Sequence, residues 1–176
     1  MDLERHQNIF LTGFMGAGKS TVGIFLAQLI GCPFHDLDSM IVEKEKRSIS
    51  EIFATDGEVY FRNCETDLLK SLNAQNSAIY ATGGGIVTRE ENRALMRHKG
   101  RIIYMQTSWA ILRERLKSSV ERPLVDTARS WTDLEQLLQR REPFYLDADL
   151  VVDTDGRNPM QIAQKIVSLL NQELNE

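Results

Sequence analysis

Residues 8–30 contain the pattern that most constrains what this chain can fold into. An apolar run, Asn-Ile-Phe-Leu-Thr, precedes a glycine-rich segment, and apolar residues then recur at helical spacing. The pattern Gly-x-x-x-x-Gly-Lys-Ser is formed by Gly13, Gly18, Lys19 and Ser20. A strand, a glycine loop and a helix in this order predict a phosphate-binding loop.

Each residue type in the loop has a chemical reason to be there. Glycines place no Cβ in the way of an anion, and the positive end of the following helix attracts it. The Lys19 ammonium can reach the β- and γ-phosphates, and the Ser20 hydroxyl can ligate the Mg²⁺ that accompanies a nucleoside triphosphate. The strand and helix on either side disfavour the alternative, a glycine turn that binds nothing. The expected nucleotide contacts are Gly13, Gly16, Ala17, Gly18, Lys19, Ser20 and Thr21.

Length and composition narrow the class of protein. We expect 176 residues to form one domain, 1–176, with a sizeable core. A net charge of −4 and a pI near 5.5 argue against nucleic-acid binding, which needs an excess of Lys and Arg. Cys32 and Cys64 have no metal-binding or redox spacing, so we expect a reducing cytoplasm. No apolar run has the length of a membrane span or of a signal-peptide core, so we expect no membrane association.

Strand-like and helix-like segments alternate along the chain, which predicts an α/β fold with a parallel sheet covered on both faces. We expect helices to be capped by Ser48, Thr88, Ser108, Ser130 and Asn158. The helix that follows Ser130 should stop before Pro143, and the helix over 58–72 should bury Tyr60, Cys64, Leu68 and Leu72. The five predicted strands cover residues 8–12, 32–38, 77–82, 101–106 and 149–153.

Two acids end the second predicted strand. Side chains two apart on a strand share a face, so Asp36 and Asp38 should project together toward a ligand. Solvated loop acids are the alternative explanation. However, strand 77–82 lacks the terminal acid that usually helps to hold Mg²⁺ opposite such a loop, which makes Asp36 the candidate metal contact and Asp38 a positioner or general base for an acceptor hydroxyl.

Gly83, Gly84 and Gly85 follow strand 77–82 directly. A glycine run at the carboxyl end of a central strand is either a plain flexible turn or a place where backbone approaches a substrate, and its position favours the second. Arg62 and Arg141 are candidate clamps for a carboxylate, because a guanidinium binds that group with two hydrogen bonds. Both are also compatible with ordinary surface positions.

Residues 117–130 are polar and show no helical period, so we expect a mobile lid. Arg115 and Arg122 flank or lie within this segment. A lid with an arginine could close over the triphosphate, exclude water and place positive charge on the transferring group. A solvated loop with a surface arginine is the alternative.

Taken together, these motifs resemble the shikimate kinase family. The resemblance rests on Gly-Phe-Met-Gly-Ala-Gly-Lys-Ser-Thr, Asp36-Leu-Asp38, Ile-Phe-x-x-x-Gly-Glu-x-x-Phe-Arg62, Gly83-Gly84-Gly85, Arg122-Pro-Leu and Arg141-x-Pro-x-Tyr145. It extends from about residue 8 to residue 160. Each motif alone is modest in specificity, but their order and spacing together are highly specific.

The resemblance implies transfer of phosphate from ATP, with Mg²⁺, to the 3-hydroxyl of shikimate, in aromatic amino-acid biosynthesis. It implies a three-layer P-loop fold with strand order 2-3-1-4-5, a lid near 117–130 and a shikimate-binding segment near 38–65. Asp38, Lys19 and Arg122 would be catalytic, and Ser20 and Asp36 would serve the metal. The implied shikimate contacts are Asp38, Arg62, Gly83, Gly84, Gly85 and Arg141, and the implied adenine contacts are Arg115 and Arg157.

Other readings stay open at this point. Another small P-loop kinase, acting on gluconate or a nucleotide, would share the glycine loop and the lid. A non-catalytic nucleotide-binding regulator could keep the fold. The joint presence of Asp38, Arg62 and Arg141 favours the shikimate-like reading over the first, and the complete phosphate loop argues against the second. We expect a cytoplasmic monomer, and whether Asp38 is a base or only a positioner is left undecided.

Overall fold

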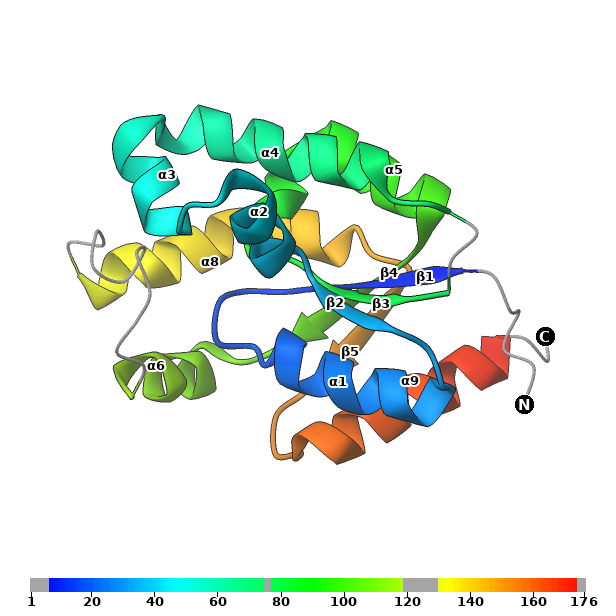
Figure 1. The fold of residues 1–176 in the computed structure, drawn as a ribbon. Helices are drawn as coiled ribbons and strands as arrows, with labels where there is room; N and C mark the ends of the chain where they lie inside the picture. The colour runs from blue at the N-terminus through cyan, green and yellow to red at the C-terminus, as the bar shows by residue number, and fades with distance from the viewer. Residues whose placement is uncertain (1–6, 75–76, 119–129, 174–176) are drawn as a thin grey trace.

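The computed structural model describes residues 7–74, 77–118 and 130–173. Its centre is a parallel sheet of five strands in the order β2-β3-β1-β4-β5, which confirms the predicted fold class and strand order. The strands are β1 (Asn8–Thr12), β2 (Phe34–Asp36), β3 (Ile79–Ala81), β4 (Gly100–Gln106) and β5 (Leu150–Asp153). Because all strands run the same way, their carboxyl ends meet at one edge of the sheet (Figure 1).

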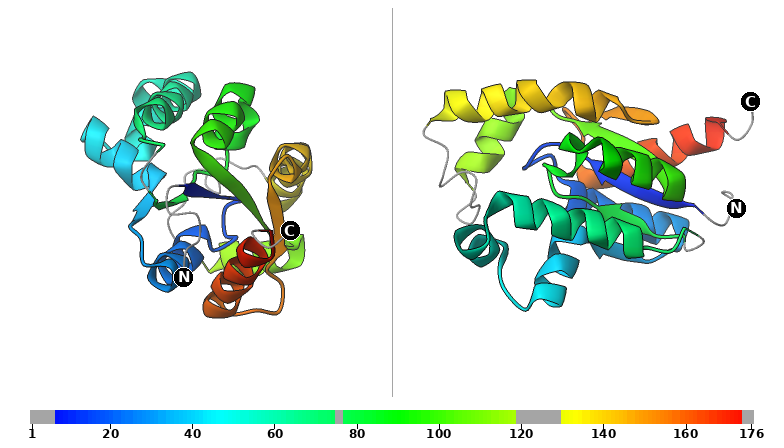
Figure 2. Two further views of the ribbon diagram at one scale, coloured as in Figure 1. Left: turned by 90° about the vertical axis from the view of Figure 1, so that its right-hand side faces the viewer. Right: turned by 90° about the horizontal axis from the view of Figure 1, so that it is seen from above.

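Helices cover both faces of the sheet (Figures 1 and 2). One face carries α1 (Lys19–Ile30) and α9 (Pro159–Glu173), and the other carries α4 (Gly57–Ser71), α5 (Glu90–Lys99) and α8 (Trp131–Leu146). The shorter helices are α2 (Leu37–Glu45), α3 (Ile49–Thr55), α6 (Trp109–Lys117) and the 3₁₀ turn η1 (Ile86–Thr88). The central strand explains this layering, since Phe10 and Leu11 on its opposite faces are fully buried.

One helix prediction was partly wrong and another was wrong. In α4 and just after it, Leu68 and Leu72 are buried as predicted, but Tyr60 is 37% exposed and the buried face includes Arg62 and Glu65 instead. Helix α8 does not stop before Pro143 but continues to Leu146. The last turn of α8 buries Tyr145, and this packing outweighs the backbone hydrogen bond that proline cannot donate.

The predicted caps were mostly confirmed. Ser48 and Glu51 form a reciprocal capping box at α3, and Ser130 accepts from the backbone N–H of Asp133 at α8. Asn158 accepts from the N–H of Gln161 at α9. Ser108 is the cap residue of α6 but makes no side-chain cap bond. The prediction for Thr88 was wrong: α5 begins at Glu90, and the Thr88 hydroxyl instead donates to the Gly85 carbonyl at 2.7 Å.

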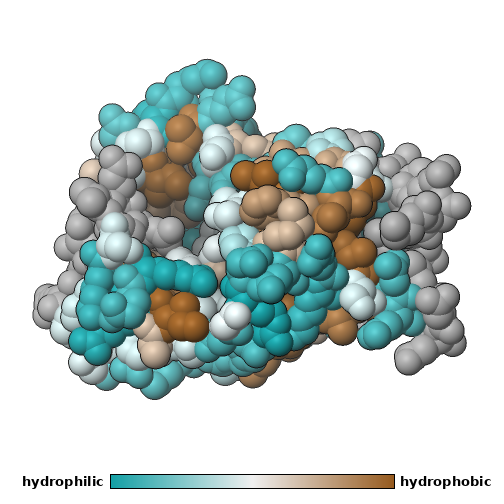
Figure 3. All heavy atoms as spheres, turned by 90° about the horizontal axis from the view of Figure 1, so that it is seen from below, coloured by the Kyte–Doolittle hydropathy of each residue, from teal (hydrophilic) through white to brown (hydrophobic). Residues whose placement is uncertain are grey.

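Figure 3 shows the face of the molecule formed by α1 and α9. Apolar patches there are interrupted by polar side chains, and the surface is hollowed toward the carboxyl ends of the strands. In the part of the chain that the structure describes, no helix combines the length and apolar character needed to cross a bilayer.

Candidate active site

The phosphate-binding loop connects β1 to α1 at the carboxyl edge of the sheet. Gly16 and Gly18 have φ angles of 86° and 89°, a left-handed conformation that favours glycine. The Lys19 ammonium donates to the carbonyls of Gly13 (2.7 Å) and Phe14 (3.0 Å), so it lies across the loop. This geometry holds a cation and the start of a helix at the place where a polyphosphate would sit.

Ser20 and Asp36 meet on the other side of the loop, where the Ser20 hydroxyl donates to Asp36 Oδ2 at 2.7 Å. Mg²⁺ usually keeps several waters and takes only one or two protein oxygens besides the phosphates of its nucleotide. One hydroxyl and one carboxylate side by side therefore fit this ion. The residues that the structure describes contain no cluster of three or more His, Cys, Asp or Glu suited to a metal.

Asp36 and Asp38 have separate roles because the strand ends earlier than expected. Asp36 is the last residue of β2 and the N-cap of α2, and its Oδ1 accepts from the N–H groups of Asp38 (3.0 Å) and Ser39 (3.2 Å). Asp38 lies in the first turn of α2. The expectation that both carboxylates share a strand face was thus wrong. One carboxylate is directed to the phosphate loop, whereas the other faces the glycine run.

A polar cluster surrounds that glycine run. A Cβ built on Gly83 would stand 2.8 Å from Asp38 Oδ1 and 3.0 Å from Glu65 Oε1, so both carboxylates approach the backbone where a side chain would interfere. A Cβ on Gly85 would overlap the Arg62 guanidinium. Gly83 and Gly85 are therefore required by close approach, which supports the substrate-facing interpretation over a plain turn.

Arg62 is buried in this cluster and bound by two carboxylates. Its Nη1 donates to Glu65 Oε2 at 2.7 Å, and its Nη2 donates to Glu58 Oε1 at 3.0 Å. Glu65 is 1% exposed, whereas the Glu58 side chain is largely exposed. Arg62 is therefore held in a fixed orientation by its own helix, with Glu65 beneath it.

The buried Glu65 carboxyl has a pKa raised to about 7. Burial is the main cause, and the charge of Asp38 adds to it, whereas the Arg62 and Arg141 guanidiniums oppose the rise. Glu65 is thus poised to change charge near neutral pH while it touches the arginine of the cluster.

Arg141 completes the cluster from α8. It is 6% exposed, and in the described part of the chain no acceptor lies within hydrogen-bond reach of its Nη1. Its guanidinium lowers the pKa of Glu65 through its charge, and it lowers the pKa of Tyr145 through both its charge and a side-chain hydrogen bond. A buried guanidinium nitrogen with no protein acceptor is costly unless a ligand supplies one, and a carboxylate suits it best.

The glycine run Gly83–Gly85 also lies against the phosphate-binding loop. A Cβ on Gly84 would stand 3.4 Å from Met15 N and 3.5 Å from Gly13 O. The phosphate-binding loop and the Asp38–Arg62–Glu65–Arg141 cluster therefore share one wall. A bound triphosphate and a bound acid on the two sides of this wall would be neighbours.

Comparison with known proteins agrees with this geometry. The family model for shikimate kinase matches residues 15–171. The shikimate kinase of Geobacter sulfurreducens is 41% identical over 166 residues, which cover 94% of this chain and 92% of that protein. The structure of shikimate kinase from Acinetobacter baumannii in complex with shikimate matches with a TM-score of 0.91 and 36% identity, covering 97% of this chain and 96% of that one.

The chain belongs to the shikimate kinase family. A gluconokinase from Sinorhizobium meliloti also matches over 96% of the chain and 93% of its own, with a TM-score of 0.60 and 16% identity. A likeness at that level of identity shows a shared fold alone. Membership of the shikimate kinase family rests on the sequence matches and on the more similar structures.

Of the remaining arginines expected in a shikimate kinase site, the structure describes the positions of Arg115 and Arg157. Arg115 donates to the Gly16 carbonyl at 3.0 Å and so contacts the phosphate-binding loop. Arg157 donates to the carbonyls of Asp153 (3.1 Å) and Asp155 (3.3 Å), which braces the loop after β5. Arg122 and the predicted lid, apart from its ends at Lys117, Ser118 and Ser130, lie outside the described residues.

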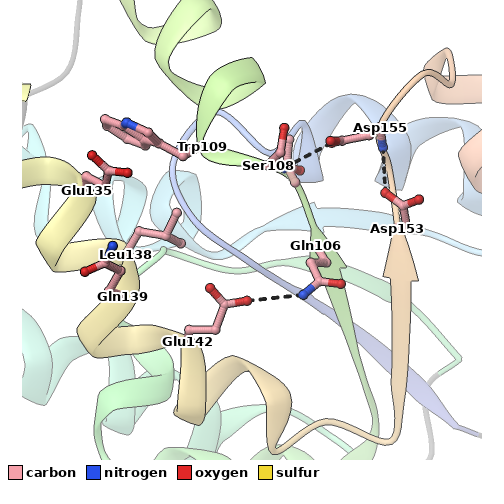
Figure 4. Close-up of a pocket in the computed structure, with 10 residues that line it drawn as sticks. Gln106, Ser108, Trp109, Glu135, Leu138, Gln139, Glu142, Asp153 and Asp155 are labelled. Carbon is pink, nitrogen blue, oxygen red and sulfur yellow. Dashed lines mark hydrogen bonds between the residues drawn. The ribbon is translucent and has the colours of Figure 1, made fainter.

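A separate pocket of about 410 Å³ opens between α8 and the carboxyl ends of β4 and β5 (Figure 4). Inside it, Gln106 donates to Glu142 at 3.2 Å, and the Ser108 N–H donates to Asp155 at 3.1 Å. Four carboxylates line it, from Glu135, Glu142, Asp153 and Asp155. This acidic lining makes the pocket unsuitable for polyphosphate or for the carboxylate of shikimate, both of which are anions.

Sequence reasoning missed two residues of this shikimate kinase site. Glu65 follows Arg62 by three positions, a spacing that on a helix signals an ion pair. That signal was available, but the incorrect buried face assigned to α4 hid it. Tyr145, whose hydroxyl donates to the Gly84 carbonyl at 2.5 Å, was noted only as part of a motif. Because the helix was predicted to end before Pro143, the prediction left out the turn that places Tyr145 beside the glycine run.

Proposed function

We propose that this chain carries out the reaction of its family, the ATP-dependent phosphorylation of shikimate, by in-line transfer of the γ-phosphoryl group to the 3-hydroxyl. The observation that supports this best is the buried Arg141 Nη1, which has no acceptor among the described residues and lies in one cluster with Arg62. Two buried guanidiniums beside an aspartate match an acceptor that has a carboxylate and vicinal hydroxyls.

In this proposal the donor is bound by Gly13, Gly16, Ala17, Gly18, Lys19, Ser20 and Thr21. Lys19, which lies 2.7 Å from the Gly13 carbonyl, would exchange its loop carbonyls for phosphate oxygens and stabilise the negative charge of the transferring group. Ser20 and Asp36 would hold Mg²⁺, with Asp36 acting through water. When bound, Mg²⁺ supplies positive charge to the β- and γ-phosphate oxygens.

The acceptor would be held by Arg62 and Arg141 through its carboxylate and by the backbone of Gly83–Gly85. Asp38 would then accept a hydrogen bond from the reacting hydroxyl, orient its oxygen toward the phosphorus and take its proton during or after transfer. Positioning supplies most of the catalysis in phosphoryl transfer, so the close approach of Asp38 to Gly83 suits this task.

Three arginines complete the proposal. Arg115, close to the phosphate-binding loop, and Arg157, in the loop after β5, would contact the adenosine part of ATP. Arg122 would approach the phosphates when the segment 117–130 closes, and closure would keep water from acting as the acceptor. Hydrogen exchange tests this closure. If an ATP analogue together with shikimate left the exchange of segment 117–130 unchanged, the lid role would be contradicted.

A coupled assay tests the function, since it measures ADP release from ATP with and without shikimate. We expect ADP release to depend on shikimate, and not on gluconate or a nucleoside monophosphate. Dependence on one of those acceptors instead would support another P-loop kinase, and nucleotide binding without any turnover would support a regulator. Either result would overturn the proposal.

The Arg141→Ala variant tests the acceptor site. A charge-assisted hydrogen bond contributes about 1.5–3 kcal/mol, so the KM for shikimate should rise at least about tenfold while the KM for ATP changes little. Arg140→Ala is the matched control, because Arg140 is the preceding residue on α8, is exposed, and donates to the Gln136 carbonyl of its own helix. Equal rises in both KM values would contradict the assignment of Arg141.

A further inference from the structure

The three carbonyls of the glycine run have different kinds of hydrogen-bond partners. The Gly83 carbonyl accepts from the Ile86 N–H at 3.2 Å, and the Gly85 carbonyl accepts from the Thr88 N–H at 3.1 Å. Both bonds belong to the local turn that includes η1. The Gly84 carbonyl instead accepts from the Tyr145 hydroxyl at 2.5 Å, a bond between residues 61 positions apart. The local turn shapes the run, whereas Tyr145 connects it to α8.

The Tyr145 ring is itself held firmly. It is 1% exposed and stacks on Tyr104 of β4, with ring centroids 5.1 Å apart and an interplanar angle of 15°. Burial raises the pKa of the hydroxyl to about 12, so it stays a donor at every pH at which the enzyme would work. The Tyr145 hydroxyl is therefore a buried, oriented donor that can hold the glycine run in place.

The connection at Gly84 affects both neighbours of that residue. Gly83 faces Asp38 and Glu65, and Gly85 faces the Arg62 guanidinium, in each case at a distance that leaves no room for a Cβ. A small rotation of the Gly84 peptide would therefore move the wall against which these side chains lie. Tyr145 is also one helical turn beyond Arg141 on α8, so the same bond fixes the distance between the loop and that arginine.

We propose that Tyr145 is a positioning residue of the acceptor site: its hydroxyl holds the Gly84 carbonyl and thereby sets the glycine run against Asp38, Arg62 and Arg141. This inference rests on the proposed function, because it assumes that shikimate binds in that cluster. Tyr145 is not placed in contact with either substrate. Its removal should therefore weaken shikimate binding more than ATP binding, because Asp38 and Arg62 lie against Gly83 and Gly85, whereas Gly84 borders the phosphate-binding loop.

The test compares Tyr145→Phe with Tyr104→Phe. Each variant loses one buried phenolic hydroxyl from the same stacked pair and keeps both rings. The Tyr104 hydroxyl donates to Glu142 at 3.3 Å and not to the glycine run, so it reports the general effect of such a loss. For both variants and the unmodified chain, KM for shikimate, KM for ATP, kcat and Tm are measured, and shikimate binding is checked by calorimetry.

We expect Tyr145→Phe to raise the KM and Kd for shikimate about tenfold, equivalent to about 1.4 kcal/mol, with the KM for ATP within about twofold of the original value. Tyr104→Phe should lower Tm by about as much as Tyr145→Phe does. It should leave the KM and Kd for shikimate within about twofold of the original values. An unchanged KM for shikimate in Tyr145→Phe would overturn the inference, as would equal rises of this KM in the two variants. Absence of shikimate-dependent turnover in the unmodified chain would instead mark failure of the proposed function.

Discussion

Glu65 Oε2 lies 2.7 Å from Arg62 Nη1 on one face of α4, and both side chains are buried. This pair connects a group that titrates near neutral pH to an arginine that we propose binds the substrate. It also differs from a surface ion pair, because Glu65 Oε1 faces Gly83 beside Asp38 and has no hydrogen-bond donor among the described residues.

Shikimate affinity should depend on the charge of Glu65. The pKa of Glu65 is raised to about 7, so the carboxyl is mostly neutral below pH 7 and ionised above it. Ionised Glu65 competes with the shikimate carboxylate for Arg62 and repels it. The KM for shikimate should therefore rise as pH increases from 6 to 9, by up to about tenfold, since one pKa unit corresponds to about 1.4 kcal/mol.

The Glu65→Gln variant should remove that dependence, because glutamine cannot ionise.

The same raised pKa of Glu65 also affects stability. The folded state binds more protons than the unfolded state between the ordinary glutamate pKa and 7, so this group's contribution to the free energy of unfolding falls as pH rises through that window. A KM for shikimate that does not change with pH in the unmodified enzyme would contradict the prediction.

Gly85→Ala should damage the acceptor site, because the new Cβ would overlap the Arg62 guanidinium. Arg62 is buried and fixed by Glu65, so it can yield only by losing that ion pair. We expect the KM for shikimate to rise more than tenfold, since moving a substrate-binding group by about 1 Å can cost about a hundredfold in rate. Steady-state kinetics with each substrate varied in turn will measure the effect.

Gly31→Ala is the control for this substitution. Gly31 caps α1 with φ of 80°, and a Cβ there would meet nothing within 4 Å. It should lower stability by about 1 kcal/mol through backbone strain without changing either KM. If both glycine variants changed the shikimate KM alike, the effect would be general destabilisation and not the contact with Arg62.

Asp36→Asn should separate the structural and metal roles of this residue. Asparagine caps a helix as well as aspartate does, so the N–H groups of Asp38 and Ser39 keep their acceptor and Tm should change little. The lost charge should raise the Mg²⁺ concentration needed for half-maximal activity at least several-fold. Titration of activity with Mg²⁺ at fixed ATP checks this.

Ser48→Ala serves as the comparison, because it removes the capping box of α3 away from the phosphate loop. It should cost about 1 kcal/mol of stability with no change in the Mg²⁺ requirement. If Asp36→Asn left both Tm and the Mg²⁺ requirement unchanged, Asp36 would only cap α2.

Asp38→Asn should abolish most turnover while ATP still binds. The amide keeps the shape of the carboxylate beside Gly83 and its oxygen can still accept a hydrogen bond, but it has no negative charge and cannot take a proton. Loss of a general base costs about 10²–10⁴ in kcat. Loss of a positioner also lowers kcat, because positioning supplies most of the catalysis in phosphoryl transfer. Near-normal kcat and KM would remove Asp38 from both roles.

The sequence by itself determined the parts of this protein whose chemistry is local. Gly13–Thr21 specifies a phosphate-binding loop because only glycines take its backbone angles and only the lysine and hydroxyl match a nucleotide with Mg²⁺. Alternating elements specified a parallel sheet with five strands, and the strand order came from the family resemblance. Caps such as Ser48 were readable for the same reason, since a cap and its partner are three residues apart.

The tertiary structure alone decided which distant side chains meet. Strand periodicity placed Asp36 and Asp38 together, yet the cap of α2 directs one to the phosphate loop and the other to Gly83. Pro143 signalled a helix end, yet the burial of Tyr145 against Tyr104 carries α8 past it to Gly84. Such contacts join residues up to 61 positions apart, and packing free energy, which depends on the whole fold, outweighs the local preferences that a sequence displays.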